Sequence, residues 1–193
     1  MSFIPFLSYV IVTTFTPGPN NIMAMSNASR MGLRRSFPFI LGVGAGFLAI
    51  MLLSSYFNLV LYHFIPRIKV GMNILGCLYM LYLAVKIVRS SSQQRDDSTS
   101  NNNSFFSGLL LQFINPKVIL YGITVISTFI TPYHYSNFRL IGFAVFLAFV
   151  GFLATFSWAL FGSLFQSFLL KYQKAFNIVM ALLLVYSALS VFS

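Results

Sequence analysis

The chain has 193 residues, of which 58% are apolar and only 7% are charged, and its mean hydropathy is +0.85. A soluble globular domain needs a surface several times richer in charge, so this composition excludes one. The 12 Lys and Arg residues against 2 acidic ones give a net charge of +10. No basic domain with aromatic base-stacking positions accompanies this charge, so nucleic acid is not an expected partner.

Six apolar stretches follow one another along the chain, each near the roughly 20 residues that span a bilayer. They run over residues 3–25, 36–62, 70–88, 105–131, 138–163 and 174–192. We therefore expect an all-α integral membrane protein with six transmembrane helices. Residues 1–193 would form a single polytopic domain in contact with the lipid bilayer. The lone Cys77 excludes a disulfide within the chain.

The basic residues lie mainly on one side of these stretches. Eight follow the first, third and fifth stretches: Arg30, Arg34, Arg35, Lys86, Arg89, Arg95, Lys171 and Lys174. On the other side are three: Arg67, Lys69 and Arg139. The positive-inside rule then predicts that the basic loops are cytoplasmic and that both termini lie outside.

The first apolar stretch is interrupted by Thr16-Pro17-Gly18-Pro19-Asn20-Asn21, hereafter the first break. A proline in a helix interior costs about 3 kcal/mol or more, because a hydrogen bond is lost and the ring clashes with the preceding turn. In lipid the freed backbone groups find no water. The first break is therefore expected to line a protected, partly wet cavity, as the broken helices of transporters do.

A polar linker, residues 90–104, divides the chain into two halves of three stretches each, 1–89 and 105–193. An odd number of spans per half makes any repeat inverted across the membrane. The third and sixth stretches align without gaps, pairing Asn73 with Asn177 and Tyr82 with Tyr186. The two tyrosines are candidates either to line the cavity or to pack with a local hydroxyl partner. Gly42 and Gly46 in the second stretch predict close packing against a broken helix, although small residues also make room for substrate.

The fourth stretch contains a second break, Gln112-Phe113-Ile114-Asn115-Pro116-Lys117. Pro116 alone would indicate a simple kink. Asn115 and Lys117 beside it favour a midplane binding site, because two interrupted segments in corresponding positions are typical of one. A buried lysine is expensive unless it faces a cavity, or unless it snorkels to the interface.

The two breaks together predict which solute such a cavity binds. The helix N-termini after Pro19 and Pro116 and the charge of Lys117 suit a carboxylate. The amides of Asn20, Asn21 and Asn115 could also hold an ammonium group, so an amino-acid-sized zwitterion fits. No Ser/His/Asp or His/Glu grouping lies within the stretches. We therefore expect no catalytic residues, metal or cofactor.

The motifs TPGPNN, GVGAGF and QFINPK together resemble those of the LysE/RhtB family of amino-acid exporters, and the similarity covers essentially the whole chain. The resemblance implies an efflux carrier in the bacterial inner membrane that exports amino acids at the expense of the proton gradient. In that membrane the positive-inside rule makes both termini periplasmic. The two family motifs fall on residues 16–20 and on Asn115, Pro116 and Lys117.

No acidic residue lies in the apolar stretches, because the only two are Asp96 and Asp97 in the linker. A basic substrate is therefore disfavoured, and small neutral ones fit better. Within that class, the resemblance implies cysteine and O-acetylserine. The same absence leaves His63, His134, Lys117 or the substrate itself to carry any coupled proton.

An exporter of another amino acid, of the homoserine or threonine type, and a passive channel remain alternatives. A structural membrane protein would not require two polar breaks. A homodimer is plausible for so small a bundle.

Overall fold

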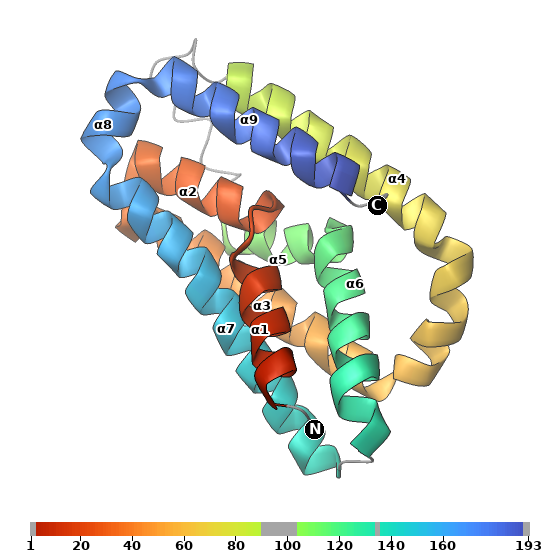
Figure 1. The fold of residues 1–193 in the computed structure, drawn as a ribbon. Coiled ribbons are helices and arrows are strands. Elements are labelled where there is room, and N and C mark those ends of the chain that lie inside the picture. Colours follow the sequence, from red (N-terminus) through yellow and green to blue (C-terminus); the bar gives the residue numbers. More distant parts are fainter. Residues whose placement is uncertain (1–2, 90–103, 134–135, 191–193) are drawn as a thin grey trace.

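The computed structural model of the chain describes residues 3–89, 104–133 and 136–190, and these are helical except for short connections (Figure 1). The helices are α1 (Phe3–Phe15), α2 (Pro19–Met31), α3 (Leu33–Tyr56), α4 (Asn58–Arg89), α5 (Phe105–Ile114), α6 (Pro116–Val125), the π-helix η3 (Ile126–Ile130), the 3-10 turn η4 (Thr131–Tyr133), α7 (Asn137–Leu164), α8 (Gln166–Lys171) and α9 (Gln173–Ser190). Helices cover all six predicted apolar stretches, and the all-α class is confirmed for the described residues.

Two of these helices, α3 and α7, are long and apolar enough to cross a membrane by themselves. The segment from Phe105 to Tyr133 is a third if its two parts, bent by 66° at Asn115, form one span. The helices α1 and α9 are apolar but shorter. The chain thus has the several apolar helices of a multi-pass membrane protein, while the six-span inverted repeat stays a prediction.

Two element boundaries differ from the sequence-based ones. The predicted second stretch reached residue 62, but α3 ends at Tyr56 and α4 runs on to Arg89 after a break at Phe57 alone. Charged residues do not interrupt a helix, since its backbone hydrogen bonds are internal. Likewise α2 continues to Met31, six residues beyond the predicted end, because its polar residues are buried among other helices. The chain then turns into α3 at Gly32, whose φ of 81° favours glycine.

The predicted close packing of Gly42 and Gly46 is confirmed. A Cβ atom on Gly42 would lie 1.9 Å from the carbonyl oxygen of Phe105, and one on Gly46 would lie 2.7 Å from Cγ of Gln112. From the other side, a Cβ atom on Gly108 would lie 2.1 Å from the carbonyl oxygen of Phe39. The backbones of α3 and α5 are therefore in direct contact, and the first half of the second broken helix is fixed against α3.

The apolar core consists of two clusters. One joins residues of α2, α3, α4, α5, α8 and α9 with Ala159 of α7, and the other joins α1, α3, α6, η3 and the first half of α7. Both α3 and α7 pass from one cluster to the other near their middles, between Val43 and Phe47 in α3 and between Val150 and Phe152 in α7. Both breaks fall at this boundary. The polar residues therefore lie at mid-depth in the bundle, between the two apolar clusters.

The ends of α2 and α4, the start of α3 and the short helix α8 gather at the upper left of Figure 1, while α1 and α7 begin at the bottom. Most of the basic residues predicted to be cytoplasmic belong to the first group of helix ends. Residues 90–103, with Arg95, Asp96 and Asp97, lie outside the described residues, as do His134 and the side chain of His63.

Candidate functional site

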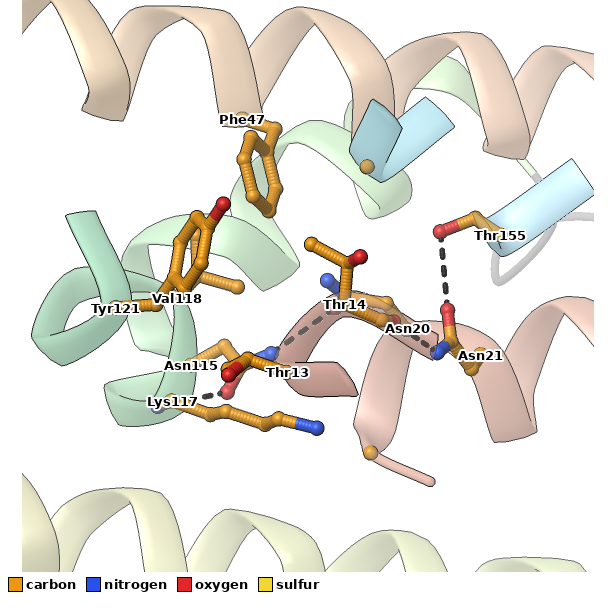
Figure 2. Close-up of a pocket in the computed structure, with 12 residues that line it drawn as sticks. Thr13, Thr14, Asn20, Asn21, Phe47, Asn115, Lys117, Val118, Tyr121 and Thr155 are labelled. Atoms are coloured by element: carbon orange, nitrogen blue, oxygen red, sulfur yellow. Dashed lines mark hydrogen bonds between the residues drawn. The ribbon is translucent and has the colours of Figure 1, made fainter. Parts of the chain in front are cut away.

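Three buried amide side chains connect the two breaks. Asn20 donates through Nδ2 to Oε1 of Gln112 at 2.8 Å, and Asn115 donates through Nδ2 to Oδ1 of Asn20 at 3.1 Å. Gln112 in turn donates to the carbonyl oxygen of Gly108 at 3.2 Å. All three amides are at most 8% exposed. Figure 2 shows Asn20 and Asn115 meeting between the helices that carry them.

The second amide of the first break, Asn21, satisfies backbone carbonyls at the end of α1. Its Nδ2 donates to the carbonyl oxygens of Thr14 at 2.9 Å and Thr16 at 3.1 Å, and its Oδ1 accepts from Thr155 of α7 at 3.1 Å. Trp158, also in α7, donates to the carbonyl oxygen of Phe15 at 3.1 Å. The last carbonyls of a helix have no partners within the helix, so these side chains replace the turn that is interrupted here.

Lys117 joins the breaks by a different route. Its ammonium nitrogen lies 3.2 Å from the carbonyl oxygen of Thr16, 2.9 Å from Oγ1 of the same residue and 3.2 Å from the carbonyl oxygen of Pro17. An ammonium has three donors, so these acceptors can use all of them. The charge also lies at the negative end of the α1 dipole. In this structure Lys117 therefore binds the first break itself rather than an open anion site.

The two half-helices that follow the breaks begin differently. At the start of α6, Asn115 caps the helix, since its Oδ1 accepts from the backbone N–H of Lys117 at 3.1 Å. At the start of α2, the N-cap is Gly18, which offers no side-chain cap. Gly18 adopts an extended φ of −170°, open to any residue, but a Cβ atom there would lie 3.3 Å from Nζ of Lys117. The uncapped α2 N-terminus is thus the natural place for an anion.

Two cavities meet at these residues. The smaller, about 30 Å³, is bordered by Gly18, Asn20, Asn21 and Asn115 and has space for a few water molecules (Figure 2). The larger, about 330 Å³, lies between α1, α4, α6 and α9 and falls in the size range of ligand pockets. Thr13, Lys117 and Tyr121 line both. These three side chains therefore lie between the two cavities. The smaller cavity is called the inner chamber below, and the larger one the outer chamber.

Most of the residues expected at the site are at these cavities. Gly18, Asn20, Asn21 and Asn115 line the smaller one, Thr16, Pro17, Pro19 and Tyr186 line the larger one, and Lys117 lines both. Pro116 instead packs on α4, where a Cβ atom on Gly76 would lie 2.3 Å from its ring. Tyr82 borders neither of these cavities; its side chain is 57% exposed, with Nζ of Lys86 5.7 Å from its ring centre.

Sequence reasoning missed Thr13, Thr155, Phe47 and Tyr121 as lining residues. A signal for Tyr121 was present, because it follows Lys117 by four positions and so shares its helix face. Thr13 was marked only by a pair of polar residues just before the first break. Phe47 was marked only as the last residue of the motif GVGAGF. Thr155 carried no signal, since its role depends on how α7 crosses the breaks.

Comparison with known proteins identifies the family. The model of LysE type translocators matches residues 11–193. The chain belongs to the LysE family. It is also 39% identical over 187 residues to the cysteine/O-acetylserine efflux proteins of Escherichia coli (strain K12) and Shigella flexneri, covering 97% of this chain and 95% of each relative. No solved structure matches the chain.

Membership of the LysE family makes this protein a transporter and not an enzyme. It confirms the family expected from TPGPNN, GVGAGF and QFINPK. The first and third of these motifs contain the residues that form the polar contacts between the two breaks. The second contains Gly42 and Gly46, which allow α5 to approach α3.

Proposed function

We propose that this LysE-family protein exports small neutral amino acids or their derivatives, with cysteine and O-acetylserine as the foremost substrates, across the bacterial inner membrane. The observation that carries the proposal is the meeting of two polar breaks at mid-depth around the uncapped N-terminus of α2. The names of the relatives supply the candidate substrates.

In this proposal the substrate carboxylate binds at the N-terminus of α2, where backbone N–H groups and the helix dipole favour an anion. The amides of Asn20, Asn21 and Asn115 border the same chamber and hold the ammonium group through their oxygens. The inner chamber is smaller than an amino acid needs. Substrate entry therefore requires Lys117 and Thr13 to move, so that the two chambers become continuous.

We propose further that export is coupled to protons without a carboxylate in the spans, since both acidic residues lie at positions 96 and 97. Lys117, His63, His134 and the substrate are the possible carriers. For Lys117 the contacts supply a reason: a neutral amine has two N–H donors and could no longer satisfy the three acceptors at the first break. Loss of its proton would therefore loosen the contact between the breaks.

The test is efflux from a strain that overexpresses the chain, measured for cysteine, O-acetylserine, homoserine and threonine. Cysteine and O-acetylserine are expected in the medium, and export against a gradient from proteoliposomes should stop when an uncoupler is added. Efflux of homoserine or threonine alone would favour the alternative substrates. Downhill flux insensitive to the uncoupler would indicate a passive channel. If none of the four compounds is exported, the proposal fails.

A further inference from the structure

The hydroxyl of Tyr121 is a buried polar group with no hydrogen-bond partner within the described part of the chain. Tyr121 lies in α6, one turn after Lys117, and its side chain is only 3% exposed. It borders both chambers. A buried hydroxyl without a partner is destabilising, so such a group calls for a partner that arrives from the chamber.

The ring of Tyr121 is held in place from two sides. It stacks on Tyr9 of α1 with ring centres 5.9 Å apart and an angle of 8°, and it lies 5.7 Å from the ring of Phe47 at 51°. Figure 2 shows its hydroxyl oxygen beside Phe47, on the opposite side of the chamber from Asn21 and Thr155. The hydroxyl therefore has a defined position, fixed by packing and not by a hydrogen bond.

The inner chamber thus has two chemically different ends. Gly18, Asn20 and Asn21 form a polar end at the start of α2. Phe47, Val118 and Gly151, which packs on Phe47, form an apolar end, where the hydroxyl of Tyr121 lies beside Phe47. A zwitterion held by its charged groups at the polar end directs its side chain toward the apolar end. A short side chain would bring its terminal atom to Tyr121.

We infer that the Tyr121 hydroxyl binds the polar atom of the substrate side chain and selects thiol, hydroxyl and ester side chains over aliphatic ones of equal size. The inference rests on the proposed function and assigns a specificity residue to the same site. A hydroxyl both donates and accepts, so it suits a thiol, an alcohol or an ester oxygen. An aliphatic side chain would leave it unpartnered, and a site of this kind rejects such analogues.

The test replaces Tyr121 with Phe and compares efflux of cysteine and 2-aminobutyrate, which carries a methyl group in place of the thiol, from loaded proteoliposomes. The wild type should prefer cysteine by about 3- to 10-fold, the value of one net hydrogen bond. Tyr121→Phe should bring that ratio close to one by slowing cysteine alone. Tyr172→Phe, at an exposed tyrosine between α8 and α9, is the matched control and should keep the wild-type ratio.

Thermal unfolding in detergent separates binding from folding. Because the hydroxyl has no partner among the described residues, Tyr121→Phe should leave the melting temperature unchanged or raise it. An unchanged substrate ratio would overturn the inference and mean that the hydroxyl contacts only trapped water. A lowered melting temperature with equal loss of both substrates would also overturn it. If the wild type exports none of cysteine, O-acetylserine or 2-aminobutyrate, the proposed function itself fails.

A second variant tests the same end of the chamber without touching the hydroxyl. A Cβ atom on Gly151 would lie 3.1–3.2 Å from three ring atoms of Phe47 and would press the ring away from α7. Gly151→Ala should therefore reduce export of O-acetylserine, the longer side chain, more than export of serine. Equal loss of both would contradict a side-chain pocket at this end.

Discussion

The carbonyl groups released at the end of α1 each have a particular side-chain partner. Asn21 donates to the carbonyl oxygens of Thr14 and Thr16. Trp158 donates to the carbonyl oxygen of Phe15, and Ser187 donates to that of Pro17 at 3.2 Å. The ammonium group of Lys117 also donates to the carbonyl oxygens of Thr16 and Pro17. The carbonyls of the break are thus satisfied by partners from α2, α6, α7 and α9 together. Single substitutions should affect both the fold and transport.

Replacing Lys117 by Met should lower both the melting temperature and export. Hydrogen bonds to charged groups contribute about 1.5–3 kcal/mol, and the carbonyls of Thr16 and Pro17 would lose this partner in a site that is only partly buried. Lys117→Arg should restore export only in part, since a planar guanidinium does not converge on the same three acceptors. Lys174→Met, at an exposed position in α9, is the control for loss of one charge. Full export by Lys117→Met would contradict the role of this contact.

Asn115 combines a helix cap with a contact between the breaks, and a matched substitution separates these roles. Ser104 caps α5 in the same way, accepting from the backbone N–H of Ser107 at 3.1 Å, but lies away from the site. Each alanine variant should lose about 1 kcal/mol of stability with its cap. Only Asn115→Ala also loses the hydrogen bond to Asn20, so it alone should reduce export at equal expression. Equal export by the two variants would assign Asn115 a purely structural role.

At the scale of the elements, hydropathy predicted where the long helices lie, because apolar length is a requirement of the bilayer itself. It could not predict that α2 extends to Met31, since the polar residues of that half-helix are buried by neighbours distant in the sequence. The meeting of Asn20 with Asn115 followed from the expected symmetry of the two breaks. Thr155 and Phe47 could not be found that way, because their place depends on how α3 and α7 cross the breaks.

The crossing of α3 and α5 should tolerate no side chain at its glycines. Gly108→Ala would place a methyl group 2.1 Å from the carbonyl oxygen of Phe39, which is backbone and cannot turn aside. The helices must separate, and the melting temperature in detergent should fall. Gly142→Ala in α7 is the control, because nothing lies within 4 Å of the added atom and alanine is favoured in a helix by about 1 kcal/mol. Equal melting temperatures for the two variants would contradict the close crossing.

At the scale of the whole molecule, the polar residues of the two breaks and the basic residues at the helix ends gather in different parts of the bundle. The polar residues of the two breaks meet at mid-depth between the two apolar clusters, whereas the basic residues at the ends of α2, α4 and α8 gather at one end of the bundle (Figure 1). Transport requires the first arrangement, and insertion into the membrane is governed by the second. We propose that the end with α8 is cytoplasmic and that α7 begins on the periplasmic side.

This orientation can be tested with two nearly isosteric substitutions, since Cys77 is the chain's one cysteine and Cys77→Ser provides a background free of thiols. In that background, Ser136→Cys places a thiol just before α7, and Ser167→Cys places one in α8; both serines are exposed. A membrane-impermeant maleimide applied to spheroplasts should label the variant at 136 and reach the variant at 167 only after permeabilisation. The reverse pattern would invert the topology. Labelling of both variants without permeabilisation would place residues 136 and 167 on the same side of the membrane. That result would contradict the proposal that α7 crosses the bilayer.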